Sequence, residues 1–259
     1  MKIRLVVEYN GANFCGWQIQ KNGRSIQAEL KKNIQIITGI EPRQLVAAGR
    51  TDAGVHARAQ VVSFELDRNF NLDKLRSGIS GLMRGELAVI GAEEVERQFD
   101  ARLSALGKRY VYTILNREAP PTINAGFVWH YPWKLNLKIM REAAEAIKGF
   151  HDFTSFRSAG CNAKTPLREI LVSKIELDGC YIYYVIEGVA FLKQMVRIIT
   201  GSLVAFGGGF AKCGNIPELI TKKDRKFAGV TAPAQGLTLD RVFYPTDQDL
   251  PDFWRVKIK

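Results

Sequence analysis

The chain has few of the residues that build metal centres and disulfide frameworks. It contains four cysteines and three histidines in 259 residues. The cysteines are far apart, form no C-x-x-C pair and have no histidine at ligand spacing; they are Cys15, Cys161, Cys180 and Cys213. This spacing matches neither a zinc motif nor a disulfide framework, so we expect no metal and four reduced, mostly buried thiols.

The sequence also lacks an apolar run long enough for a signal peptide or a membrane span. Acidic residues are outnumbered, since 37 Lys and Arg stand against 26 Asp and Glu and give a net charge of +11. Such an excess favours a polyanionic partner, such as nucleic acid, over a small neutral substrate. With 46% apolar residues the chain can bury a proper core. We therefore expect a cytoplasmic globular protein with no membrane association.

Strand and helix patterns alternate along the chain. In the first half, strands are predicted over residues 2–9, 58–66 and 87–96, and helices begin at the potential N-caps Ser25 and Asn71, the first of them ending at Gly39. In the second half, strands are predicted over 107–116, 169–177, 180–187 and 237–243, and helices over 137–148 and 191–206. Asp178-Gly179 between two apolar runs is a strong hairpin signal.

This order predicts an α+β fold made of two related halves, residues 1–104 and 105–259. Short connections and strands with one apolar face favour a mainly antiparallel sheet with helices packed on one side. We expect the halves to share this sheet and to form the active, RNA-binding cleft between them.

The stretch Gly49–Ala57, with the sequence GRTDAGVHA, places one carboxylate and one guanidinium close to two glycines. Glycine permits positive φ or a close approach to a ligand, and Arg50 and Asp52 supply charge on a loop that a scaffold can hold rigid. The alternative is an ordinary hairpin turn in which Asp52 bonds its own backbone. A lone loop histidine such as His56 is more typical of a structural hydrogen-bonding residue than of a base.

Basic residues lie close to aromatic residues in the sequence. Arg24 follows Trp17, Arg50 and Arg58 flank Asp52, and Lys108 and Arg109 precede Tyr110. Planar rings beside cations suit the stacking of unpaired bases and the neutralisation of phosphates, although such charge runs are also typical of solvated surfaces. We predict an RNA partner with exposed bases, and Arg24 and Arg58 are candidate contacts to it.

Further motifs accompany the Gly49–Ala57 loop. In chain order they are Tyr9-Asn10-Gly11, Gly16-Trp17-Gln18, Lys108–Tyr112, His151-Asp152-Phe153 with Phe156, Phe191–Arg197 and Thr231–Leu237. Together these motifs resemble those of the bacterial tRNA pseudouridine synthase A family. The resemblance runs from residue 9 to about residue 240, and we assign no role to the tail from Phe243 to Lys259.

The resemblance implies two ferredoxin- or RRM-like α/β-sandwich halves and a cofactor-free isomerase. Its substrate is tRNA, in which uridine becomes pseudouridine at positions 38, 39 and 40 of the anticodon stem-loop. A homodimer that holds one tRNA across both subunits is implied as well. The sequence does not specify the geometry of that dimer or the set of tRNAs.

Site residues follow from the same resemblance. It implies that Asp52 is the nucleophile, Arg197 pairs with Asp52, Tyr110 packs on the target base, Arg50 helps to displace that base, and Leu237 lines the pocket. Two of these roles have a simpler alternative: a surface arginine for Arg197 and a core tyrosine for Tyr110. Tyr110 is also a candidate for removing the C5 proton, and the sequence leaves open whether Asp52 attacks C1′ or acts through a glycal.

The chemistry agrees with these assignments. The reaction breaks the N1–C1′ bond and joins C5 to C1′, and an ionised carboxylate can attack and then leave, as in retaining glycosidases. Burial beneath a base would raise the pKa of Asp52 unless a cation compensated, and Arg197, between Val196 and Ile198, supplies one. Two other classes remain open from the sequence: a non-catalytic RNA-binding protein and a nucleoside hydrolase that would release uracil.

Overall fold

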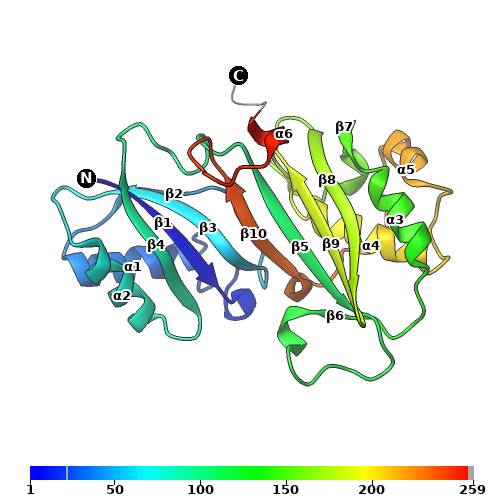
Figure 1. Ribbon diagram of the computed structural model, residues 1–259, viewed down its shortest axis with the longest axis horizontal. Coiled ribbons are helices and arrows are strands. Elements are labelled where there is room, and N and C mark those ends of the chain that lie inside the picture. Colours follow the sequence, from blue (N-terminus) through cyan, green and yellow to red (C-terminus); the bar gives the residue numbers. More distant parts are fainter. Residues whose placement is uncertain (22, 256–259) are drawn as a thin grey trace. The chain divides into compact units, whose positions relative to one another are not determined.

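A computed structural model describes residues 1–21 and 23–255 of the chain. Its contacts divide the chain into two compact units (Figure 1): unit 1 comprises Met1–Leu106 and the C-terminal residues from Thr238, and unit 2 comprises Gly107–Leu237. The first boundary lies close to the one expected between residues 104 and 105. The second half, expected to be 105–259, differs because the chain returns to unit 1 after Leu237.

Unit 1 is a mainly antiparallel sheet with two long helices. Its strands are β1 (Lys2–Tyr9), β2 (Arg43–Ala47), β3 (His56–Glu65), β4 (Leu87–Val95) and β10 (Leu237–Phe243), in the order β4-β1-β3-β10 with β2 also paired to β3. β1 is antiparallel to β3 and β4, whereas β10 runs parallel to β3. Helices α1 (Ile26–Thr38) and α2 (Leu72–Leu82) lie side by side, and α2 packs on β4 (Figure 1).

Local sequence explains these elements. β1 buries Ile3, Leu5 and Val7 completely, as its alternation predicts, and each such side chain stabilises the fold by about 1.5–3 kcal/mol. The Ser25 side chain accepts a hydrogen bond from the Ala28 N–H and so caps α1. α1 ends at Gly39, whose φ of +70° is left-handed. The predicted caps of α1 are therefore confirmed.

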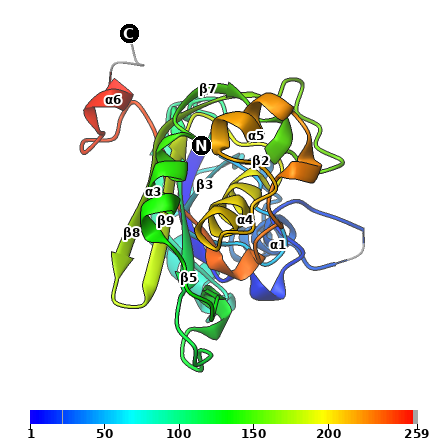
Figure 2. The ribbon, with the colours of Figure 1, turned by 90° about the vertical axis from the view of Figure 1, so that its right-hand side faces the viewer.

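Unit 2 is also a mainly antiparallel sheet with helices. Its strands are β5 (Gly107–Leu115), β6 (Trp129–His130), β7 (Gly149–Asp152), β8 (Leu167–Asp178) and β9 (Tyr181–Gly188), in the order β5-β9-β8-β7 with β6 also paired to β5. Its helices are α3 (Leu137–Glu145), α4 (Met195–Gly207) and α5 (Ile216–Lys222). α3 packs on α4 and on β8 (Figure 2). The predicted mainly antiparallel α+β class is thus confirmed for each unit.

The structure corrects several details of the sequence-based expectation. β2, β7 and α5 were not predicted, and α3 ends at Glu145, before the expected residue 148. α4 begins at Met195, not near 191, because Gln194 has a φ of +59° that no helix permits. The hairpin loop is Gly179-Cys180, since Asp178 already pairs with Tyr181.

The cysteines are free, as expected, but each is only half-buried. No helix within residues 1–21 and 23–255 is long and apolar enough to cross a membrane.

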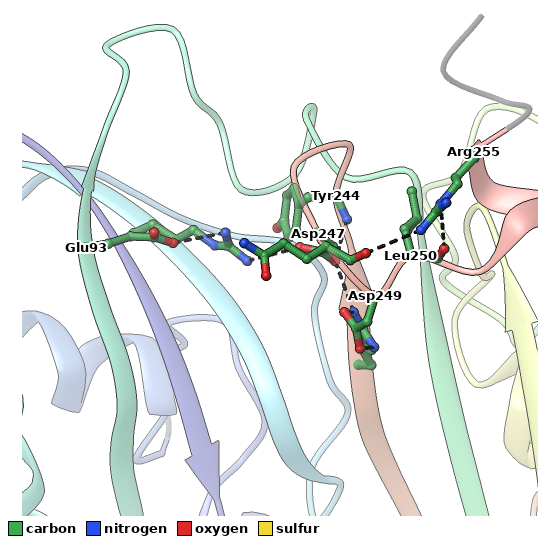
Figure 3. A network of polar contacts seen from close by, with 9 residues as sticks. Glu93, Tyr244, Asp247, Asp249, Leu250 and Arg255 are labelled. Carbon is green, nitrogen blue, oxygen red and sulfur yellow. Dashed lines mark hydrogen bonds and ion pairs between the residues drawn. The ribbon is translucent and has the colours of Figure 1, made fainter.

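Residues 244–255, to which the sequence assigned no role, pack on unit 1 (Figure 3). Arg4 lies 3.0 Å from Glu93 and 3.8 Å from Asp247, and these pairs link the segment to β1 and β4. Trp254, in the short helix α6 (Asp252–Arg255), is fully buried. The segment therefore contributes Tyr244, Leu250 and Trp254 to the core of unit 1.

In unit 2, the loop before β10 lies directly on α4 because two glycines let the backbones touch. A Cβ on Gly201 would lie 1.8 Å from the carbonyl oxygen of Val230, and a Cβ on Gly229 would lie 2.3 Å from the carbonyl oxygen of Gly201. The Gly229 N–H donates to Ser202 Oγ at 2.9 Å. These contacts fix the loop relative to α4.

We predict that Gly201→Ala lowers the free energy of unfolding by about 2 kcal/mol or more, because the added methyl group forces the loop off the helix. Urea denaturation would show a lower midpoint. Gly81→Ala is the matched control: Gly81 lies within α2 and its added Cβ would meet nothing within 4 Å. Alanine should stabilise that helix by about 0.5–1 kcal/mol. A Gly201→Ala protein as stable as the wild type would contradict the close packing.

Candidate active site

Asp52 occupies the first position of a tight turn between β2 and β3 in unit 1. The Val55 N–H donates to the Asp52 carbonyl oxygen at 3.1 Å, and Gly54 has a φ of +76°, which favours glycine. Asp52 is half-buried, and Arg50, two residues earlier, is exposed. The loop therefore contains an ordinary tight turn that begins at Asp52.

The end of β1 and the segment that follows it support this turn. The Trp17 N–H donates to the Thr51 carbonyl oxygen at 3.1 Å, and the Tyr9 hydroxyl lies 2.9 Å from the Thr51 hydroxyl. Burial raises the pKa of Tyr9 to about 12, so its hydroxyl stays protonated at neutral pH. The residue immediately before Asp52 is thus held by two separate contacts.

Two glycines and one histidine complete the support. A Cβ on Gly11 would lie 2.1 Å from the Val55 carbonyl oxygen, and a Cβ on Gly16 would lie 2.8 Å from the Thr51 carbonyl oxygen. The Gly11 N–H donates to Nδ1 of His56 at 3.0 Å, and His56 is buried. The structural hydrogen-bonding role that the sequence favoured for His56 agrees with this contact.

Tyr110 lies on β5 of unit 2 and is 7% exposed. Its ring meets Phe191 edge to face, with 5.1 Å between the ring centroids. The neighbouring Arg109 donates from Nε to Glu187 at 2.6 Å. Tyr110 is therefore held within a packed strand, and its position is set by residues that precede α4.

Arg197 lies in the first turn of α4 and is half-buried. Its Nε donates to the Ala232 carbonyl oxygen at 2.7 Å, and the Ala232 N–H donates back to the Arg197 carbonyl oxygen at 3.1 Å. This reciprocal pair fixes one edge of the guanidinium group. The same loop leads to Leu237, which is buried at the start of β10.

Tyr112 supports that loop from β5. Its hydroxyl donates to the Pro233 carbonyl oxygen at 2.7 Å, and a Cβ on Gly236 would lie 2.6 Å from the Tyr112 ring. Burial raises the pKa of Tyr112 well above its ordinary value, so the hydroxyl remains a donor. Tyr112 thereby sets the backbone immediately before Leu237.

Arg24 and Arg58 both pair with carboxylates of unit 1. Arg24 donates to Glu29 at 3.0 Å and to Glu86 at 2.7 Å, and these pairs raise its pKa above the usual value. Arg58, whose side chain is 70% exposed, lies 3.2 Å from Asp240. Arg24 therefore forms ion pairs with a residue of α1 and with the residue immediately before β4.

The predicted site residues fall into two sets. Unit 1 carries Asp52, Arg50, Arg24 and Arg58, and unit 2 carries Tyr110, Arg197 and Leu237. Sequence reasoning missed the supporting roles of Tyr9 and Tyr112, although both lie within the quoted motifs. Their partners are 42 and 121 residues away, so no local signal identifies them. Across the described part of the chain, no cluster of three His, Cys, Asp or Glu side chains could hold a metal ion.

Comparisons with known proteins identify the family. A family profile described as tRNA pseudouridine synthase matches residues 143–245. The chain is 40% identical to tRNA pseudouridine synthase A of Citrifermentans bemidjiense over 93% of its own length and 97% of that protein. It is 42% identical to the protein of the same name from Vibrio parahaemolyticus, over 97% and 95% of the two chains.

Among solved structures, a Cbf5-Nop10-Gar1 complex aligns with a TM-score of 0.38 and 14% identity, over 94% of this chain and 59% of that chain. The relatives of about 40% identity extend over nearly the whole sequence, including both sets of site residues. The chain therefore belongs to the tRNA pseudouridine synthase A family, whose members are isomerases.

Proposed function

We propose that this protein isomerises uridine to pseudouridine in tRNA. The observation that carries the proposal is the turn that contains Asp52, held by the contacts of Trp17 and Tyr9 with Thr51. It lies in a chain that is about 40% identical to a tRNA pseudouridine synthase A over 93% of its length. The proposed targets are positions 38, 39 and 40 of the anticodon stem-loop, which follow from the resemblance of the motifs.

The proposed reaction conserves every heavy atom. The N1–C1′ bond of uridine breaks, the uracil rotates, C5 bonds to C1′, the hydrogen on C5 leaves as a proton, and N1 takes up a proton. Asp52 attacks the sugar or the base and is then displaced, which suits an ionised carboxylate. Since substrate and product have the same oxidation state, the chemistry calls for no redox carrier.

Residues of unit 2 complete the proposed mechanism. Arg197 is proposed as the cation that keeps Asp52 ionised, because a guanidinium group can bind a carboxylate through two N–H donors. Tyr110 packs on the uracil and is the candidate that removes the C5 proton. Leu237 supplies an apolar wall of the pocket, which favours the base over water.

A base in an RNA stem must leave the stack before a carboxylate can reach its sugar, at a cost of a few kcal/mol. We assign part of this work to Arg50, which is exposed and two residues from Asp52. Arg24 and Arg58 are proposed to add electrostatic attraction for the phosphates, in keeping with the net charge of +11. A cytoplasmic homodimer that binds one tRNA across both subunits is the proposed working form.

Asp52→Asn should lower the rate of isomerisation by orders of magnitude, while the fold and the affinity for tRNA are retained. The amide keeps the shape of the carboxylate, and the turn is closed by the Asp52 backbone oxygen, which the substitution leaves in place. The amide is, however, a far poorer nucleophile. Release of tritium from tRNA labelled at C5 of uridine measures turnover, and filter binding measures affinity.

Asp67→Asn is the matched control, since it removes one negative charge at an exposed position of unit 1 and should keep full turnover. Substantial tritium release by a folded Asp52→Asn protein would remove Asp52 from the mechanism. Binding without tritium release by the wild type would indicate a non-catalytic RNA-binding protein, and free uracil would indicate a hydrolase.

Arg50→Ala should reduce turnover by about 10- to 100-fold, because a contribution of about 1.4–2.8 kcal/mol to base opening is lost. Affinity should change little, because phosphate contacts elsewhere survive. Single-turnover rates on a stem substrate and on one whose target uridine is already unpaired distinguish the roles: only the first should suffer. Arg76→Ala removes the same charge at an exposed position of α2, to which no role is assigned, and should leave the rate unchanged. Equal losses on both substrates would refute the flipping role.

The affinity for tRNA should fall steeply with salt, because several Lys and Arg side chains displace counterions from phosphates. Filter binding at a series of salt concentrations measures the slope of log K against log salt. The slope should be clearly negative, and each phosphate contact should contribute almost −1 to it. A flat dependence would argue against an extended RNA footprint.

A further inference from the structure

We propose that His56 is a positioning residue that, in one neutral tautomer, locks the segment Gly11–Trp17 against the Asp52 turn. The proposal rests on the proposed function, in which Asp52 is the nucleophile. Its starting observation is the 3.0 Å hydrogen bond from the Gly11 N–H to Nδ1 of His56, with both residues buried. A nitrogen that accepts a hydrogen bond carries no proton, so the ring proton belongs on Nε2.

The Gly11 N–H requires an acceptor of this kind. Gly11 begins the short 3-10 helix Gly11–Asn13, whose first N–H groups have no partner inside the helix. The Asn10 side chain accepts the N–H of Ala12, and His56 accepts the N–H of Gly11. His56 thus serves as a cap supplied by a residue 45 positions away. Without it a buried donor would lose its partner.

The capped segment touches the Asp52 turn on both sides. On one side, Gly11 lies against the Val55 carbonyl oxygen, and Val55 closes the turn with Asp52. On the other side, Gly16 and Trp17 contact the carbonyl oxygen of Thr51. A shift of the segment would therefore move the carboxylate.

His56 is well placed to hold the segment still because it is itself fixed by the sheet. It begins β3 directly after Val55, and its backbone is in register with Thr238 of β10. The imidazole therefore connects a rigid strand to an irregular segment. A misplacement of about 1 Å in a reacting group can cost on the order of 100-fold in rate, which sets the expected size of the effect.

The side-chain geometry of asparagine and glutamine provides a direct test. The Oδ1 of asparagine lies where Nδ1 of histidine lies, so His56→Asn keeps an acceptor for the Gly11 N–H. His56→Gln carries its amide farther out, near the position of Nε2, and leaves Gly11 without the acceptor. We expect kcat to fall about 100-fold in His56→Gln and less than about tenfold in His56→Asn, with KM for tRNA within about twofold in both. His130→Gln, in unit 2, is the control and should resemble the wild type.

Two measurements test the hydrogen bond between Gly11 and His56 without an activity assay. The ¹⁵N shifts of His56 in the wild type should show an unprotonated Nδ1 and a protonated Nε2 at neutral pH. Hydrogen exchange of the Gly11 amide should be slow in the wild type and in His56→Asn and fast in His56→Gln. A protonated Nδ1, or unchanged Gly11 exchange in a folded His56→Gln protein, would overturn the proposal.

Kinetic outcomes are equally decisive. Full activity in His56→Gln would show that the hydrogen bond between Gly11 and His56 does not position Asp52. Equal inactivity of His56→Asn and His56→Gln, with Gly11 still protected in His56→Asn, would indicate instead that the imidazole acts directly on the substrate. Failure of the proposed function has a different signature: Asp52→Asn, measured in parallel, would retain turnover while the tautomer and the Gly11 exchange stayed as predicted.

Discussion

The hydrogen bond between the buried hydroxyls of Tyr9 and Thr51 joins the end of β1 to the turn that carries Asp52. A buried hydrogen bond of this kind contributes only about 1 kcal/mol net, yet leaving one of its members unpaired costs about 1–3 kcal/mol. A shift between β1 and the turn would therefore cost free energy, because it would leave a buried hydroxyl group unpaired. The close approaches of Gly11 and Gly16 to the same turn add a steric limit, so the carboxylate's position follows from the pairing of β1 with β3.

In unit 2, a buried tyrosine hydroxyl and close glycine contacts hold the candidate site residues in a similar way. The loop that contacts Arg197 and leads to Leu237 lies on α4 through Gly201 and is held from β5 by the Tyr112 hydroxyl. In both units a buried tyrosine bonds an irregular segment, and glycine allows the backbones to meet. The candidate site residues are thereby placed by neutral, buried contacts whose strength does not depend on salt.

Sequence patterns predicted the elements whose signals are local. Ser25 and Asn71 marked helix starts because an N-cap acts within three residues, and the alternation in β1 identified its buried face. β2 and β7 were missed because five and four residues are too few to show a period. The Asp52 loop was predicted as a candidate site from its own residues. Its supports were not, because which distant residue Tyr9 or Tyr112 bonds is decided by the tertiary fold.

Arg24 shows that a charge pattern alone does not reveal which carboxylates a basic residue pairs with. Its neighbours in sequence made it a candidate contact to RNA, and in the structure Glu86, 62 residues away, and Glu29 also lie against its guanidinium. With 39% of its side chain exposed, these ion pairs are worth little, at most about 1 kcal/mol. They cannot be what fixes the segment beside Asp52. That task falls to the buried contacts of Tyr9 and His56, where water does not compete for the hydrogen bonds.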